Sequence, residues 1–174
     1  WYTKKKLSKN NKKIFDKKFK DIIKKLSNNL KLKNNFFVHR DFHVSNLILI
    51  KNKIGVIDNQ DALIGNKAYD LASLIDDVRF KTSYSFKKKI YDYYLHTNRK
   101  IDRNKFKNDF EILSVLRNFK VIGIFTRLAT RDNKKKYLKL IPYAWKLISI
   151  RVKENKNFDD LLFLLKHFFK KEIK

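Results

Sequence analysis

The stretch FVHRDFHVSNLILIKNKIGVIDNQD, residues 37–61, decides the fold that we expect for this chain of 174 residues. Within it a short apolar run, residues 47–50, is separated by a polar turn from a second apolar run, residues 54–57. Two such runs joined by a short polar turn are typical of a β-hairpin. A hairpin at this place folds Asp58 back toward Asn46, and the sequence therefore predicts that these two side chains meet.

The polar residues around this hairpin are the types that phosphoryl transfer needs. Asn46 and Asp58 carry oxygen atoms, and Mg²⁺ is usually held by one or two protein groups while water and substrate phosphates fill its other positions. Asp41 precedes Asn46 in the loop, and an Asp at this place in a kinase catalytic loop accepts the proton of the substrate hydroxyl. We interpret the stretch as the catalytic and metal-binding core of a kinase, in which positioning and electrostatics supply most of the catalysis.

His39 lies just before Asp41 in this loop and has two interpretations. It can brace the loop through hydrogen bonds, or it can transfer protons. The brace is favoured, because a buried polar side chain normally needs hydrogen-bond partners.

Three segments together carry a family resemblance: HRDFHVSN at residues 39–46, IDNQDA at residues 57–62 and YDLASL at residues 69–74. With them the chain resembles the C-terminal lobe of the aminoglycoside phosphotransferase and choline kinase-like superfamily, whose members share the protein-kinase fold and phosphorylate small molecules with ATP. The later run RNFKVIGIFTRL, residues 117–128, and the opening Trp1-Tyr2 are similar to bacterial kinases that phosphorylate the anomeric hydroxyl of N-acetylmuramate and N-acetylglucosamine for cell-wall recycling.

The resemblance implies a set of roles around the hairpin. Asp41 is the implied catalytic base, Asn46 and Asp58 are the implied Mg²⁺ ligands at the nucleotide site, and Asp70 is an implied structural acid that bonds back to the catalytic loop. ATP and Mg²⁺ are the implied cofactors, and a small molecule is the implied substrate. Asp61 stays open between a polar contact near the metal or substrate and a carboxylate that caps a local turn.

Acceptor recognition is expected from polar residues that follow the catalytic loop. Besides Asp61, the candidates for sugar or carboxylate contacts are Asp76, Asp77, Arg79, Arg117, Arg127 and Arg131. Arg117, Arg127 and Arg131 stand out because most basic residues of this chain are Lys. An Arg side chain suits a bidentate contact with a planar anion. The alternative is internal salt bridges, such as Arg131 with Asp132 or Asp77.

The expected fold is mainly α-helical with one small β-hairpin, as in the large, C-terminal lobe of the protein-kinase-like fold. Apolar spacing predicts helices near residues 10–30, 70–75, 86–94, 137–150 and 159–170, with a long helix after Asp102 as N-cap. Phe158, Phe163, Phe168 and Phe169 are expected in the core. We expect residues 1–174 to form a single domain.

The sequence shows no pattern typical of the small lobe of a kinase. Such a lobe needs a glycine-rich loop over the ATP phosphates and a Lys paired with a helix Glu, whereas the three glycines, Gly55, Gly65 and Gly123, form no such pattern. We therefore expect the chain to be a fragment of a longer gene product. We expect this fragment to lack the N-terminal ATP-binding lobe and to be inactive alone. Two other interpretations stay open: the same fold with another acceptor, such as an aminoglycoside or a choline-like molecule, or a non-catalytic binding module.

Composition constrains the partners and the compartment. The chain has no cysteine, which excludes disulfides and thiolate metal sites, and it shows neither a signal peptide nor an apolar run of membrane length, so we expect a cytoplasmic protein. The formal net charge of +26 could attract nucleic acid or an anionic membrane. Because the lysines are scattered over every segment, we expect a solvated surface and neither specific nucleic-acid nor membrane binding, with attraction of ATP, an anionic sugar or an acidic partner as the alternative. The sequence indicates no oligomeric state.

Overall fold

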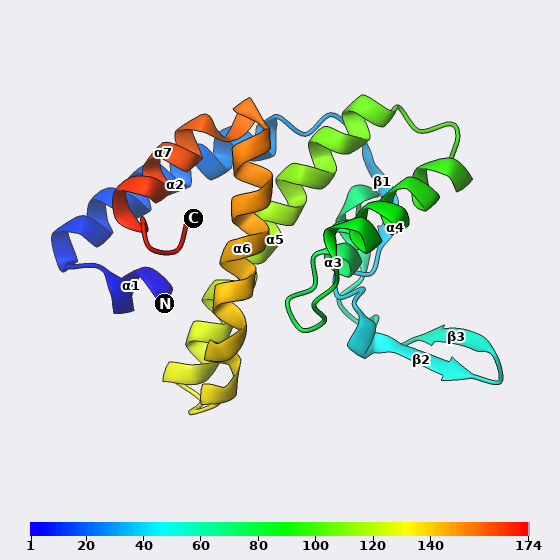
Figure 1. Cartoon of the computed structure of the whole chain (residues 1–174), viewed down its shortest axis with the longest axis horizontal. Coiled ribbons are helices and arrows are strands. Elements are labelled where there is room, and N and C mark those ends of the chain that lie inside the picture. The colour runs from blue at the N-terminus through cyan, green and yellow to red at the C-terminus, as the bar shows by residue number, and fades with distance from the viewer. Residues whose placement is uncertain (174) are drawn as a thin grey trace. The chain divides into compact units, whose positions relative to one another are not determined.

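The computed structural model describes residues 1–173, apart from the side chains of residues 5 and 154, and divides the chain into two compact units (Figure 1). Unit 1 combines residues 1–29 with the segment that begins at Val115, and unit 2 is Leu30–Ser114. The helix α5, Arg103–Thr130, belongs to unit 2 in its first part and to unit 1 in its second. We describe each unit by itself.

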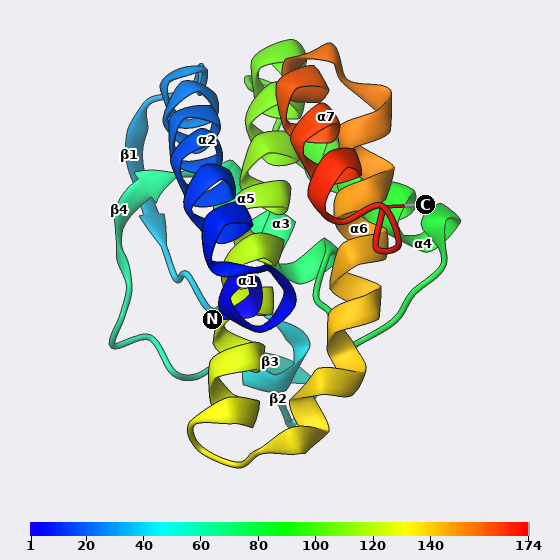
Figure 2. The ribbon, with the colours of Figure 1, turned by 90° about the vertical axis from the view of Figure 1, so that its left-hand side faces the viewer.

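The described residues of unit 1 form helices and the loops that join them. Besides the second part of α5, its elements are α1 (Tyr2–Lys6), α2 (Lys9–Asn28), the 3₁₀ helix η2 (Lys135–Leu140), α6 (Ile141–Glu154), the 3₁₀ helix η3 (Lys156–Phe158) and α7 (Asp159–Phe168). α2 packs against α7, and α1 lies at one end of α2 (Figure 2). Ser8 caps α2, because its hydroxyl accepts a hydrogen bond from the Asn11 backbone N–H at 3.3 Å.

Aromatic side chains fill much of the core of unit 1. The Tyr2 ring lies 5.7 Å from the Trp145 ring and 5.6 Å from the Phe169 ring, between ring centres. Its hydroxyl donates to Glu172 Oε1 at 3.0 Å. Burial, and then the charge of Glu172, raise the pKa of Tyr2 above its ordinary value.

Unit 2 contains two separate pairs of antiparallel strands. Its elements are β1 (Asn34–Val38), the 3₁₀ turn η1 (Val44–Asn46), β2 (Leu47–Ile50), β3 (Lys53–Val56), β4 (Leu63–Asn66), α3 (Ala68–Ile75), α4 (Tyr84–Thr97) and the first part of α5. β2 pairs with β3, with Leu47 opposite Val56, which confirms the predicted hairpin. β1 pairs with β4, a pairing that the sequence analysis did not predict, because the two segments are distant in sequence and no short turn joins them.

The apolar core of unit 2 lies between α3, α4 and α5. Phe106 and Phe110 from α5 are buried against Leu71 and Ile75 from α3, with Leu95 from α4. These residues recur at helical spacing, so each helix turns one apolar face inward. The fold class is therefore the mainly α-helical one that the sequence predicts.

A buried carboxylate connects the first residues of unit 2 to its core. Asp109 of α5 accepts hydrogen bonds from the backbone N–H groups of Lys31 and Leu32 at 2.8 and 2.9 Å and from Asn66 Nδ2 at 2.7 Å. Asn66 in turn accepts from the Ala68 backbone N–H at 3.0 Å, at the start of α3. Each of these backbone N–H donors is thus paired, as buried backbone groups require.

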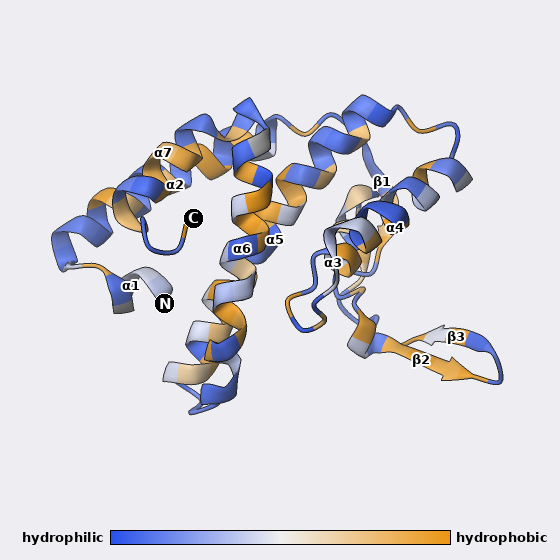
Figure 3. Cartoon of the chain, viewed as in Figure 1, coloured by the Kyte–Doolittle hydropathy of each residue, from blue (hydrophilic) through white to orange (hydrophobic). Residues whose placement is uncertain are grey.

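The hairpin β2–β3 does not contribute to the core. Its strand β2 is apolar (Figure 3), yet Leu49 is 73% exposed and Ile54 of β3 is 69% exposed. Contiguous exposed apolar side chains are typical of surfaces at which proteins or ligands bind.

Several helix boundaries differ from the predicted ones. The segment expected as one helix over residues 137–150 is split into η2 and α6, and Pro142 lies in the first turn of α6, where a missing N–H is tolerated. Asp102 does cap α5, since its Oδ1 accepts from the backbone N–H groups of Asn104 and Lys105, each at 3.0 Å. None of the helices within residues 1–173 is long and apolar enough to cross a membrane.

One predicted core residue is on the surface. Phe163 is 74% exposed, so its assignment to the core was wrong. The buried face of α7 is formed by Leu161, Leu164 and Leu165, which follow the spacing of one side of a helix. Two residues correspond to about 200° of rotation in an α-helix, so Phe163 lies opposite Leu161.

Candidate functional site

The predicted catalytic loop follows β1 and is held by a carboxylate from α3. Asp70 accepts a hydrogen bond from the His39 backbone N–H at 2.7 Å through Oδ2 and from the Arg40 backbone N–H at 3.0 Å through Oδ1. Arg40 has a φ of 71°, in the left-handed region that non-glycine residues rarely adopt. Such a backbone persists when its surroundings hold it, and the Asp70 carboxylate supplies part of that support.

Two further hydrogen bonds join this loop to the segment after β3. His39 is buried, and its Nε2 lies 3.0 Å from the Ile57 carbonyl oxygen, to which it donates as the Nε2–H tautomer. The Ile57 backbone N–H donates to the Asn46 carbonyl oxygen at 3.0 Å. The loop and the segment that precedes Asp58 are therefore held in one register.

Asn46 lies between Asp41 of the catalytic loop and Asp58, which follows β3. Its Nδ2 donates to the Asp41 carbonyl oxygen at 2.9 Å and lies 3.4 Å from Asp58 Oδ2. The Asn46 side chain is buried, whereas Asp41 is half-buried and Asp58 is exposed. The structure thus brings Asp41, Asn46 and Asp58 together, at the base of the hairpin.

Asp58 has an unusual backbone and a neighbour that the sequence analysis missed. Its φ is 70°, again in the left-handed region, and such outliers gather at ligand-binding and catalytic sites. Gln60 Nε2 donates to Asp58 Oδ1 at 2.7 Å. The i, i+2 spacing of an amide after a loop carboxylate is the one signal in the sequence that could have identified Gln60.

The side chains at this place suit a hard divalent cation. The amide nitrogen of Asn46 is engaged by Asp41 and Asp58, which orients the amide so that Oδ1 is the atom available as a ligand. Within residues 1–173, no group of three or more His, Cys, Asp and Glu side chains could hold a metal ion. A site of one carboxylate and one amide oxygen matches Mg²⁺, which keeps most of its positions for water and phosphate oxygens.

The candidate acceptor residues lie in both units. Asp61 in unit 2 is exposed, and its carbonyl oxygen accepts from Arg40 Nη1 at 3.3 Å. Asp77, also in unit 2, is 1% exposed and pairs with Arg79 Nη1 at 3.1 Å.

The three candidate arginines all belong to unit 1. Arg117 is buried, and Arg127 is half-buried. Arg131 forms a bidentate pair with Asp132, Nε to Oδ1 at 2.6 Å and Nη2 to Oδ2 at 3.2 Å. This pair raises the pKa of Arg131 and lowers the pKa of Asp132. It is one of the internal salt bridges that the sequence left open as the alternative to an acceptor contact.

One cavity of unit 1 is formed by other residues. It has a volume of about 920 Å³, and its lining includes Tyr2, Ile141, Trp145 and Ser149. None of the predicted catalytic, metal-binding or acceptor residues lines it.

The comparisons with known proteins agree on one type of protein. The sequence pattern of the phosphotransferase enzyme family matches residues 2–104. An N-acetylmuramate/N-acetylglucosamine kinase of Caulobacter vibrioides is 34% identical over 119 residues, which cover 66% of this chain and 33% of that protein. A protein of the same name from Neisseria meningitidis is 40% identical over 112 residues, which cover 61% and 34%. A third, from Pseudomonas aeruginosa, is 33% identical over 129 residues, which cover 67% and 36%. The chain thus spans about a third of the length of the curated relatives it matches.

Proposed function

Because this chain belongs to the phosphotransferase enzyme family, we propose that the protein containing it transfers the γ-phosphoryl group of ATP to a hydroxyl of a small molecule. The observation that carries this proposal is the position of Asn46, whose amide lies 2.9 Å from the Asp41 carbonyl oxygen and 3.4 Å from the Asp58 carboxylate. This arrangement unites a loop acid with two oxygen-bearing side chains, the set that a kinase needs to orient a hydroxyl beside a nucleotide.

Each residue at the base of the hairpin then has a defined task. Asp41 accepts the proton of the acceptor hydroxyl and orients its oxygen for attack. Asn46 and Asp58 would hold Mg²⁺, which neutralises charge on the ATP phosphates when bound. Gln60 holds Asp58 through Oδ1 and leaves Oδ2 facing Asn46. His39 is the brace rather than a proton carrier, since its Nε2–H is committed to the Ile57 carbonyl.

We further propose that the acceptor is an amino sugar, N-acetylmuramate or N-acetylglucosamine, phosphorylated at its anomeric hydroxyl during cell-wall recycling in the cytoplasm. The names of the relatives support the two sugars as acceptors, whereas the anomeric hydroxyl and cell-wall recycling rest on the family resemblance of the sequence. Residues 1–174 would form the large lobe of the kinase-like fold and act together with a separate ATP-binding lobe. Asp61, Arg117, Arg127 and Arg131 remain proposed acceptor contacts.

The experiment is an acceptor panel with the full-length gene product that contains this chain. ADP release and ³¹P NMR of the product are measured with ATP, Mg²⁺ and N-acetylmuramate, N-acetylglucosamine, an aminoglycoside or choline. We expect turnover of the two amino sugars, and Asp41→Asn to lower kcat about 10²- to 10⁴-fold, the usual contribution of a positioned acid or base. Asp92→Asn, an exposed change on α4, serves as the matched control. Turnover of another acceptor alone would reject the amino sugar assignment.

A second candidate function is a non-catalytic binding module. It is favoured by the exposed apolar side chains of the β2–β3 hairpin, including Leu49 and Ile54. The same panel separates the two candidates, because a binding module transfers no phosphoryl group to any acceptor, and Asp41→Asn would then change nothing.

A further inference from the structure

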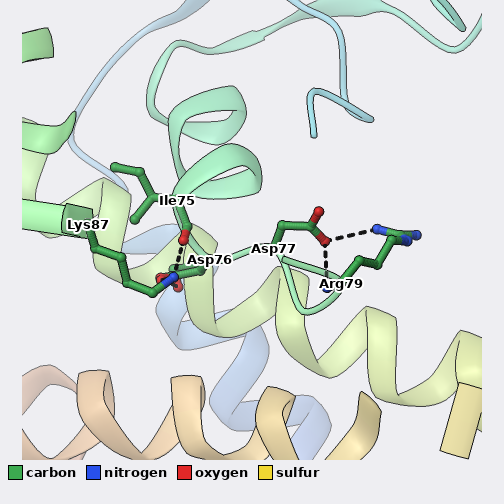
Figure 4. Close-up of polar contacts among 6 residues, drawn as sticks. Ile75, Asp76, Asp77, Arg79 and Lys87 are labelled. Carbon is green, nitrogen blue, oxygen red and sulfur yellow. Dashed lines mark hydrogen bonds and ion pairs between the residues drawn. The ribbon is translucent and has the colours of Figure 1, made fainter. Parts of the chain in front are cut away.

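The loop after α3 begins with two consecutive buried carboxylates whose surroundings differ. Asp76 has partners at both oxygens: Lys87 Nζ lies 3.3 Å from Oδ1, and the Ser114 hydroxyl donates to Oδ2 at 2.5 Å. Asp77 is 1% exposed, and its Oδ1 accepts from the Arg79 backbone N–H at 3.2 Å and from Arg79 Nη1 at 3.1 Å. Its Oδ2 is buried and has no hydrogen-bond partner among the described residues. In Figure 4 this second oxygen points away from Arg79.

An unpaired, buried carboxylate oxygen is costly. Burying a polar atom without a hydrogen bond costs about 1–3 kcal/mol, and more for a charged group. Arg79 compensates the charge of Asp77 at one oxygen only. A buried polar group without a partner calls for an explanation, and a donor from outside the chain would supply the missing partner of this oxygen.

The site is rigidly built by its neighbours. The Lys87 ammonium is buried, and besides Asp76 it bonds the carbonyl of Ile75 at the end of α3, where the helix dipole favours a cation (Figure 4). Ser114 of α5 holds the same Asp76 carboxylate from another element. The backbone that leads into Asp77 is thereby anchored to α4 and α5, which preorganises the carboxylate for a ligand.

The same helix connects this carboxylate to the catalytic loop. Asp70, in the first turn of α3, holds the His39 and Arg40 backbone, and Asp77 follows directly after the end of the helix. At 1.5 Å per residue, the two acids are separated by about 10 Å along the helix.

We propose that Asp77 is a specificity-determining residue that binds the acceptor, with Oδ2 accepting a hydrogen bond from a non-reacting hydroxyl or amide N–H of the sugar. Arg79 is a positioning residue that holds the Asp77 carboxylate in place through its backbone N–H and its guanidinium. Because the guanidinium already balances the negative charge, the site favours neutral hydroxyl and amide donors over the ammonium groups of an aminoglycoside. This inference rests on the proposed function, since it presumes an amino sugar acceptor.

The test uses the full-length gene product and Asp77→Asn, which preserves shape but replaces the accepting oxygen by a donor. A hydrogen bond to a charged group is typically worth a 10- to 100-fold change in binding. We expect the KM for N-acetylglucosamine to rise about 10- to 100-fold, with the KM for ATP unchanged and the melting temperature close to wild type. Unchanged acceptor KM would overturn the inference while leaving the proposed function intact. Absence of turnover by the wild-type enzyme with every amino sugar would instead reject the proposed function.

Deoxy sugars identify the contact and exclude a merely structural role. N-acetylglucosamine analogues that each lack one non-anomeric hydroxyl are compared on the wild type and on Asp77→Asn. One analogue should lose about tenfold in kcat/KM with the wild type and show no further loss with the variant, as coupled partners do. An analogue without the N-acetyl group is included in the comparison. If every analogue loses as much kcat/KM with the wild type as with Asp77→Asn, the contact is refuted. If Asp77→Asn does not fold, Arg79→Gln replaces it: a rise of about tenfold in acceptor KM supports the proposal, and no rise refutes it.

Discussion

Replacing Asp70 by alanine should loosen the catalytic loop by a predictable amount. The carboxylate accepts two hydrogen bonds, from the backbone N–H groups of His39 at 2.7 Å and Arg40 at 3.0 Å. A hydrogen bond to a charged group contributes about 1.5–3 kcal/mol. Two such bonds give about 3–6 kcal/mol in full. Because Asp70 is only half-buried and water can reach part of the vacated space, we expect a net loss of about 2–4 kcal/mol.

Hydrogen exchange measures this loss at the two amides themselves. At about 1.4 kcal/mol per factor of ten, a loss of about 2–4 kcal/mol corresponds to exchange of the His39 and Arg40 amides that is about 30- to 700-fold faster. Amides in the middle of α5, such as that of Phe110, should change less, because the core around them is intact. Urea denaturation followed by circular dichroism reports the global part of the effect.

The matched control is Asp92→Ala on α4. Asp92 pairs with Lys88 one helical turn away, and both side chains are more than half exposed. Exposed pairs contribute little to stability, so the two loop amides should keep their protection in this variant. If Asp70→Ala accelerates their exchange no more than Asp92→Ala does, then the carboxylate does not hold the loop and the reasoning from its geometry fails.

Two further predictions concern the cores of the units. In unit 2, Phe106→Ala should lower the free energy of unfolding by about 3–5 kcal/mol, because Phe106 is fully buried. In unit 1, Phe163→Ala should change the free energy of unfolding by less than about 0.5 kcal/mol, because Phe163 is exposed. Urea denaturation of both variants measures the two effects, and equal effects would contradict the difference in burial. In unit 1, burial and the charge of Glu172 raise the pKa of Tyr2 above its ordinary 10.0, so the folded chain keeps this proton to higher pH than the unfolded chain. The resulting stability is fully present below about pH 10 and is lost as the pH rises through the folded pKa; the difference in tyrosinate absorbance between the wild type and Tyr2→Phe measures that pKa, and an ordinary midpoint would refute the prediction.

The parts of the site that the sequence predicted are those built by local geometry. Asn46 and Asp58 flank a hairpin, so a short turn suffices to bring them to within 3.4 Å. Gln60 was missed, because an amide two residues after a carboxylate is common in loops and only coordinates show that it donates to Asp58 Oδ1. The same limit applies to Asp76 and Asp77, which are chemically identical neighbours in the sequence. Their different roles follow from Lys87 and other residues brought to them by the fold.

The sequence by itself determined the helical class, the β2–β3 hairpin, the N-cap at Asp102 and the family to which the chain belongs. The first three follow from hydrophobic periodicity and turn composition, which act over a few neighbouring residues, and the family follows from the resemblance of three short segments. Only the tertiary structure decided the pairing of β1 with β4, the exposure of Phe163 and the unpaired oxygen of Asp77. Each of these depends on which distant segment packs against the residue, and burial or hydrogen bonding between distant segments is a property of the folded chain that no local pattern encodes.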